Sequence, residues 1–201
     1  MYDSTSISPF HLRTSIESVR RNPANYLGDL NSPDLTTRLA FTSLFCYDSQ
    51  DKCCSIVRIC VSENKIIVRY NVGMSLEVSS DTDGALIAEI CLTVGTEDSS
   101  KPFSDEPILF DFGLAALNAV CSRMFVKVCS EERSAEFLFE KGKLINVPIV
   151  MSSECEDHTE FVIELDASIL PNTTFDYAKI VQEASRFIKM TGIPIRVEQM
   201  M

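Results

Sequence analysis

The chain has 201 residues, of which 45% are hydrophobic, and this size fits one globular domain with a substantial core. Its formal net charge of -11 argues against broad contact with a nucleic-acid backbone, which requires clustered lysine and arginine. No apolar run approaches the ~18–20 residues of a membrane span, and the N-terminus lacks a basic segment followed by an apolar one. We therefore expect a cytoplasmic protein that contacts neither nucleic acid nor membrane directly.

The cysteine spacing indicates free thiols rather than a metal site or a disulfide framework. There are 8 cysteines, without any CxxC pair, and most lie within apolar runs, which is typical of buried thiols in a reducing compartment. A zinc site needs converging ligands, and the chain has just two histidines, His11 and His158, so no metal site is expected. Both histidines are interpreted as surface residues, and the alternative is a catalytic pair with Cys155 or Asp157.

The N-terminal part of the chain predicts an extended arm followed by two helices. Residues 1–10 are polar and contain a proline, as extended arms often do. Apolar residues at helical spacing predict a helix over residues 11–21, which Pro23 ends. Asp34 is the expected N-cap of the second helix.

Strands dominate the rest of the sequence. β-branched residues over 55–62 and 65–71 predict a β-hairpin. The remaining expected elements, in chain order, are a helix over 85–94, a loop over 95–108, a helix over 113–124, strands over 125–129, 134–141, 144–151 and 159–166, a helix over 176–191 and a strand over 193–198. This order predicts an α+β fold in a single domain over residues 11–201.

Several segments also carry a family pattern, and the clearest is SIESVRRNPANYLGD, a helix with a basic end, then a proline and a Tyr-Leu-Gly-Asp turn. The others, in the same order as in the family, are residues 2–7, 84–94, 113–122, 173–177 and 193–196. Together they resemble the ATPase domain of bacterial DNA gyrase B and of its topoisomerase IV counterpart. The resemblance implies a Bergerat (GHKL) fold, a two-layer sandwich of a mixed, mostly antiparallel sheet with helices on one face. It places the end of the chain where the family's transducer domain begins, so no transducer domain is expected.

Two positions that the family needs for ATP hydrolysis are changed. The family's catalytic helix carries a glutamate that activates water and an asparagine that holds Mg²⁺. Counted without a gap from Gly28-Asp29, Thr42 replaces the glutamate and Cys46 replaces the asparagine. A neutral hydroxyl is no general base near pH 7, and a thiol is a poor ligand for a hard cation. The resemblance thus implies that the catalytic positions are degenerate.

The nucleotide-contacting motif is altered as well. Its aspartate, which accepts a hydrogen bond from adenine in the family, corresponds to Tyr70, and its two glycines correspond to Val72 and Met74. A side chain at a position that needs glycine obstructs close approach of a ligand to the backbone. A one-residue slip gives the alternative in which Asn71 takes the place of the lost aspartate.

The family's phosphate-binding lid and its strand threonine complete the comparison. The glycine-rich lid corresponds to residues 107–113, in which Gly113 alone remains and Asp111 adds a charge that repels phosphate. Thr159 corresponds to the strand threonine that contacts the nucleotide, although a threonine on a strand is more often structural. We therefore expect a vestigial pocket partly filled by apolar side chains, namely Phe45, Tyr70, Met74, Leu109 and Phe112.

The sequence thus predicts a catalytically inactive relative, a pseudo-ATPase without cofactor, that acts as a protein-interaction or regulatory module. The partner is expected to be a second copy or a topoisomerase subunit, with a homodimer formed through the arm near Tyr2. The alternative is a divergent module of a type II topoisomerase assembly that binds ATP with Mg²⁺ through Asp29, Asn71 and Thr159. A third interpretation, an acidic decoy for DNA, rests on the net charge alone.

Overall fold

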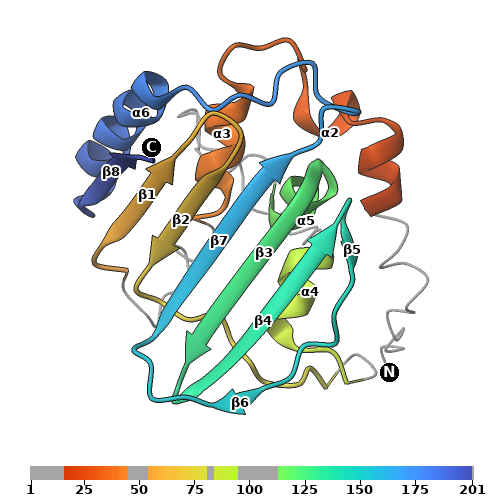
Figure 1. Cartoon of the computed structure of the whole chain (residues 1–201), viewed down its shortest axis with the longest axis vertical. Helices are drawn as coiled ribbons and strands as arrows, with labels where there is room; N and C mark the ends of the chain where they lie inside the picture. Colours follow the sequence, from red (N-terminus) through yellow and green to blue (C-terminus); the bar gives the residue numbers. More distant parts are fainter. Residues whose placement is uncertain (1–15, 45–53, 81–83, 95–112, 201) are drawn as a thin grey trace, which may run out of the picture.

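The computed structural model describes residues 16–44, 54–80, 84–94 and 113–200, and its centre is an eight-stranded sheet (Figure 1). The strand order is β5-β4-β3-β7-β2-β1-β8, with β6 beside β4. The strands are β1 (Val57–Val61), β2 (Ile66–Tyr70), β3 (Cys121–Ser130), β4 (Arg133–Glu140), β5 (Lys143–Leu144), β6 (Met151–Ser152), β7 (His158–Leu165) and β8 (Ile195–Gln199). Neighbouring strands pair antiparallel except β1 and β8, which pair parallel.

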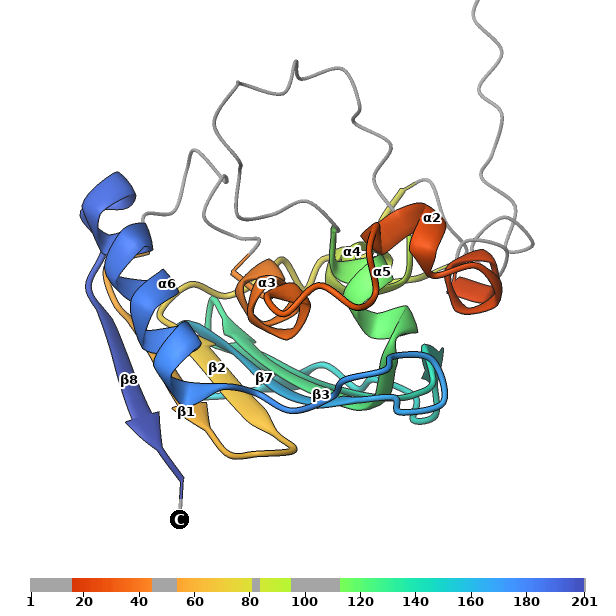
Figure 2. The same cartoon turned by 90° about the horizontal axis from the view of Figure 1, so that it is seen from above.

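The described helices cover one face of this sheet, as Figure 2 shows from above. They are a helical segment at residues 16–21, α2 (Ala24–Leu27), α3 (Leu35–Thr42), α4 (Ile87–Thr93), α5 (Gly113–Ala119) and α6 (Tyr177–Thr191). The α+β two-layer sandwich with a mixed, mostly antiparallel sheet is therefore confirmed. Within the described ranges, none of these helices is long and apolar enough to cross a membrane.

The core lies between the sheet and the helices because alternate strand residues are apolar. On β1, for example, Val57, Ile59 and Val61 are buried while Arg58 between them is exposed. The helix layer closes over these side chains, and the rings of Phe41 and Phe187 join α3 to α6 at a centroid distance of 6.1 Å.

Helix α6 forms where local sequence signals predict it. The Asp176 carboxylate accepts hydrogen bonds from the backbone N–H groups of Ala178 (2.9 Å) and Lys179 (3.2 Å), which caps the helix N-terminus. Gly192 ends the helix with a φ of 74°, a left-handed conformation that favours glycine. Both ends of this helix agree with the sequence prediction.

Several predicted elements differ in extent from those in the structure, and the short helix α2 was not predicted. The helix expected over residues 113–124 ends at Ala119, and Cys121 begins β3. Beyond Pro23, which ends the first helical segment, the chain forms the short helix α2, because the fixed φ of proline suits a first helical turn.

The strand expected over residues 144–151 is not continuous, because the strand ladder with β4 stops after Leu144 and resumes at Met151 in β6. At Asn146 the side-chain amide, in place of the residue's backbone, makes the hydrogen bonds to β4. Its Oδ1 accepts from Leu138 N (2.7 Å) and its Nδ2 donates to Glu136 O (2.8 Å). Pro148 follows and has no N–H to donate to a ladder. The predicted arm (1–10), the loop at 95–108, His11, Cys46 and Asp111 lie outside the described residues.

Candidate functional site

The register of the sheet brings Tyr70 and Thr159 together. Tyr70 is the last residue of β2 and pairs with Thr159 near the start of β7. Both are buried, with exposed fractions of 3% for Tyr70 and 0% for Thr159. The chain leaves β2 at Asn71, so Val72 and Met74 follow within a few residues of the pair.

The Thr159 hydroxyl is engaged in two hydrogen bonds with the segment that follows β2. It donates to the carbonyl oxygen of Val72 at 2.8 Å and accepts from the backbone N–H of Met74 at 3.3 Å. A hydroxyl has one proton to donate, and here that proton is used within the protein. Thr159 therefore holds the 72–74 backbone against β7.

Gly73, between those two residues, packs directly against β3. A Cβ atom placed on Gly73 would lie 2.2 Å from the carbonyl oxygen of Cys129 and 2.6 Å from Cβ of Ser130. Real side chains do not tolerate such distances, so the segment approaches β3 this closely because residue 73 has no side chain. The glycine at this position serves contact between two parts of the protein's own backbone.

The other polar groups predicted for the pocket also bond within the chain. Thr42, 1% exposed, donates from Oγ1 to the Arg38 carbonyl oxygen one helical turn earlier, at 2.9 Å. Asn71 accepts at Oδ1 from the backbone N–H groups of Ser55 (3.0 Å) and Ile56 (3.1 Å). Its Nδ2 donates to Ser55 Oγ at 2.8 Å. Asn71 thus fixes the chain before β1.

Apolar side chains leave little space beside Tyr70. Val72 and Met74 are 4% and 5% exposed. Tyr70 also lines a small cavity of about 10 Å³, together with Leu44, Val57, Phe187 and Ile193, and this is roughly the space of one water molecule. Cys54 also lines it, and burial raises the pKa of the Cys54 thiol. Of the side chains expected to fill the pocket, Tyr70 and Met74 are buried as expected, whereas Phe45, Leu109 and Phe112 lie outside the described residues.

A much larger groove, about 1240 Å³, lies elsewhere, between residues 16–21, α4 and the β4–β5 turn. Its lining includes Arg20, Glu89 and Lys141, and burial raises the pKa of the Glu89 carboxyl group. Of the expected pocket positions that the structure describes, none lines this groove.

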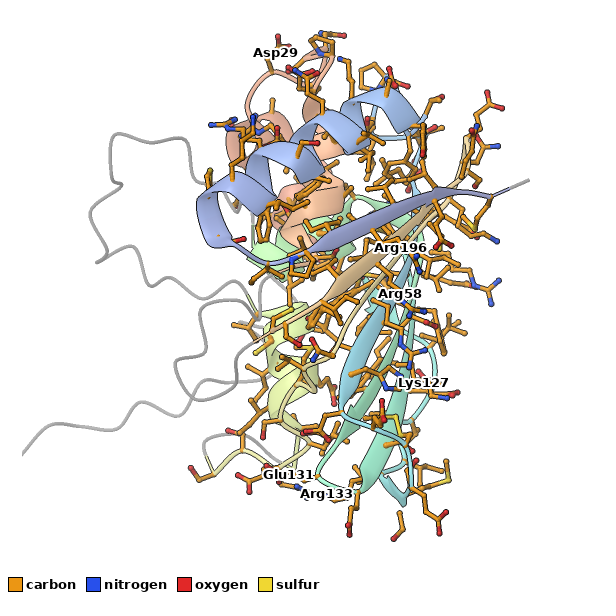
Figure 3. The ribbon with its side chains drawn as sticks, turned by 90° about the vertical axis from the view of Figure 1, so that its left-hand side faces the viewer. Asp29, Arg58, Lys127, Glu131, Arg133 and Arg196 are labelled. Atoms are coloured by element: carbon orange, nitrogen blue, oxygen red, sulfur yellow. A yellow bond between two sulfur atoms is a disulfide. The ribbon has the colours of Figure 1, made fainter. Side chains whose placement is uncertain are left out.

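Asp29 does not join Asn71 and Thr159. Its Oδ1 accepts from the backbone N–H of Asn31 at 2.9 Å in an exposed turn after α2. Figure 3 shows Asp29 at one end of the molecule, and Glu131 of the β3–β4 turn at the other. Thr159 lies toward the Glu131 end because it pairs with Val128 of β3. The three residues assigned to ATP binding in the alternative prediction are therefore not brought together.

Gly113 is the first residue of α5 and has a φ of 70°, which favours glycine. It lies at the position predicted for the last lid glycine, and the preceding lid residues are outside the described ranges.

Two predictions about cysteine and histidine are wrong. Cys129 and Cys155, expected as free thiols, are joined by a disulfide. His158, expected at the surface, is 6% exposed, and its Nδ1 lies 2.8 Å from the carbonyl oxygen of Glu156. The separation of Cys129 from His158 along the chain carries no sign of their proximity, which arises from the pairing of β3 with β7.

An ion pair that sequence reasoning missed joins the helical segment 16–21 to the sheet. Arg20 Nη2 donates to Asp166 Oδ2 at 2.7 Å, and Arg20 Nη1 donates to the Ala119 carbonyl oxygen at 2.7 Å. Burial opposes ionisation of Asp166, but hydrogen bonds from Ser168 and Arg20 outweigh it and lower the pKa of the carboxyl group to about 2. These bonds fix Arg20, near the end of the helical segment 16–21, against Asp166 and Ala119.

The eight-stranded sheet, with the described helices on one face, is the architecture that the comparison with solved structures matches. No protein-family model matches the sequence, and a search of curated proteins found no match. Among solved structures, the chain is similar to the 43K ATPase domain of Thermus thermophilus gyrase B, determined in complex with an aminocoumarin. The TM-score is 0.76 at 16% sequence identity, and the match covers 96% of this chain and 50% of that one. The chain spans about half the length of that structure, and the likeness establishes the fold.

Proposed function

We propose that this protein is a pseudo-ATPase, a GHKL-fold module that neither binds nor hydrolyses ATP and acts through contacts with other proteins. One observation carries the proposal. Three polar side chains at the predicted nucleotide positions, those of Thr42, Asn71 and Thr159, make hydrogen bonds within the protein itself.

The space at the site supports the same conclusion. Val72 and Met74, at the positions of the family's two glycines, are 4% and 5% exposed, so their side chains occupy space that a ligand would need. Entry of an adenine ring would require displacement of the buried Met74 and separation of its backbone from Thr159. Each buried polar group left without a partner costs ~1–3 kcal/mol, so nucleotide binding has to overcome this loss.

The chemistry at Thr42 supports inactivity. General-base activation of water requires a group that accepts a proton near neutral pH. The Thr42 side chain is a neutral hydroxyl, and it donates its proton to a backbone carbonyl of its own helix.

A phosphate-release assay tests the inactivity. We expect the full chain with ATP and Mg²⁺ to release inorganic phosphate no faster than its Thr42→Ala variant, with both at the rate of the buffer. Faster release by the unmodified chain than by this variant would contradict the proposal. The variant keeps helix α3, because alanine is the best helix former.

The proposed partner is another protein, either a second copy or a topoisomerase subunit, and the proposed dimer contact is the arm at the N-terminus. The support is the resemblance of residues 2–7 to the family's arm and a net charge of -11, which disfavours direct nucleic-acid binding. Light scattering of the full chain and of a chain without residues 1–13 tests this. A dimer that becomes a monomer on deletion is expected, and an unchanged mass would reject the arm-mediated dimer.

The second candidate, a divergent ATP-binding module of a type II topoisomerase assembly, is favoured by the likeness to an ATPase domain. Asp29 lies away from Asn71 and Thr159, so these three residues do not contact one nucleotide together. This candidate therefore requires a different set of nucleotide contacts. Binding of ATP by the Thr42→Ala variant and the unmodified chain alike, without phosphate release, would favour this candidate.

A further inference from the structure

The cluster of Cys129, Cys155 and His158 combines groups that bind soft metals. Cys129 of β3 and His158 of β7 are directly opposite in the antiparallel register, so their side chains point to the same face of the sheet. That face is the one away from the helices. Figure 3 shows Lys127 on it, and Cys129 is two residues further along the same strand. Cys155, between β6 and β7, reaches Cys129 to form the disulfide.

The distances suit coordination of one ion. One ligand atom each from Cys129, Cys155 and His158 lies within 4.8 Å of the other two. In a tetrahedral zinc site, with Zn–S of ~2.3 Å and Zn–N of ~2.1 Å, ligand atoms are separated by ~3.5–3.8 Å. A disulfide holds its sulfur atoms about 2.05 Å apart. Cleavage of the disulfide and a separation of the sulfur atoms by ~1.7 Å would therefore give the zinc geometry.

The hydrogen bond of His158 leaves one ring nitrogen available for a metal. Its Nδ1 lies 2.8 Å from the Glu156 carbonyl oxygen, which only accepts, so Nδ1 carries the proton. Nε2 of the neutral ring then keeps its lone pair. A backbone carbonyl that holds the other nitrogen is the usual support for a metal-binding histidine. Near the sulfur atoms, Ser153 Oγ donates to Cys155 Sγ at 2.8 Å.

We propose that Cys129, Cys155 and His158 form a zinc site when the disulfide is reduced, and that oxidation closes this site. A dithiol reductant supplies two electrons and two protons, which break the S–S bond and yield two thiols, while the reductant becomes a disulfide. Zn²⁺ then displaces both thiol protons into solvent and binds two thiolates and the His158 nitrogen. A water molecule takes the fourth position.

The cluster adjoins residues 72–74, the segment that follows β2. The Cys129 carbonyl oxygen is the atom against which Gly73 packs, and His158 directly precedes Thr159, which holds Val72 and Met74. A change between disulfide and zinc moves the Cys129 and Cys155 sulfur atoms apart. Residues 72–74 are the part of the predicted pocket that packs against Cys129.

Cobalt titration of the full chain tests the proposal. The metal-free chain is reduced with a phosphine, which becomes the phosphine oxide by taking oxygen from water and does not add thiols. Co²⁺ is then added as the optical probe. The expected result is one equivalent bound with thiolate-to-cobalt absorption, displaced by one equivalent of Zn²⁺, and no such absorption from the oxidised chain.

Three variants make the test specific. Cys155→Ser should abolish the thiolate-to-cobalt absorption, and His158→Gln should weaken binding by at least ~10-fold. Cys54→Ser is the matched control, because Cys54 is a thiol outside the cluster, and it should bind as the unmodified chain does. Circular dichroism checks that each variant is folded, and His158→Gln, which retains both cysteines, decides if Cys155→Ser does not fold. Absence of cobalt binding by the reduced chain, or equal binding by His158→Gln, would overturn the proposal and leave a structural disulfide.

Discussion

Removal of the Thr159 hydroxyl tests whether this residue serves the fold. Valine has nearly the shape of threonine without its hydroxyl, so Thr159→Val leaves the Val72 carbonyl and the Met74 N–H without their 2.8 Å and 3.3 Å hydrogen bonds. Both residues are buried, with exposed fractions of 4% and 5%. At ~1–3 kcal/mol for each of the two buried polar groups left unpaired, we expect the free energy of unfolding to fall by ~2–6 kcal/mol.

Urea unfolding followed by circular dichroism measures this change, with both proteins kept oxidised. In a chain of this size 1 kcal/mol corresponds to ~2–4 °C, so the melting temperature should fall by roughly 4–24 °C. Thr42→Val is the matched control, because its hydroxyl bonds to a carbonyl that already accepts a helical N–H, and its cost should stay below ~1 kcal/mol. The reasoning fails if Thr159→Val unfolds within ~0.5 kcal/mol of the unmodified chain.

Two further substitutions probe backbone packing and acid stability. Gly73→Ala should lower the free energy of unfolding by ~1–3 kcal/mol, because the new Cβ would lie 2.2 Å from a backbone oxygen. Ser75 is exposed, so the control Ser75→Ala should lower it by less than ~0.5 kcal/mol. Equal urea midpoints for these two variants would contradict the packing. Folding lowers the pKa of Asp166 from its ordinary 3.8 to about 2. The ionised carboxylate therefore stabilises the folded chain fully above pH 3.8, and this stabilisation is lost as the pH falls toward 2. This loss amounts to ~2 kcal/mol. Asp166→Asn should therefore flatten the pH dependence of the urea midpoint between pH 5 and 2, and an unchanged slope would refute this role of the pair.

The elements that the sequence predicted well depend on local signals. The β-branched residues of β1 and β2 form the expected hairpin, and α6 begins at Asp176 and ends at Gly192 because a side-chain cap and a left-handed glycine act within a few residues. The boundary between α5 and β3 was missed because Leu117, Cys121 and Met124 continue the spacing of a helix, whereas pairing with β7 decides in favour of a strand. Asn146 shows another limit, since its amide substitutes for strand backbone only because Leu138 and Glu136 lie opposite.

The candidate site was predictable in its positions and not in its contacts. Alignment with a family pattern identified Tyr70 and Thr159, and the sheet places them side by side. The partners of Thr159, and the packing of Gly73 on Cys129, depend on how β2, β3 and β7 meet in space. The same pairing brings Cys129 opposite His158, which no spacing rule for metal ligands or disulfides reveals.

Isothermal titration calorimetry of the full chain with a non-hydrolysable ATP analogue and Mg²⁺ tests the central claim most directly. The central claim is that Thr42, Asn71 and Thr159 make hydrogen bonds within the protein, and that buried Val72 and Met74 stand where the family has glycines. The account predicts no binding heat, and no rise in melting temperature at millimolar analogue, where a ligand at 100 times its Kd would add ~2.7 kcal/mol. Saturable binding of one analogue per chain that Thr159→Val weakens would contradict it.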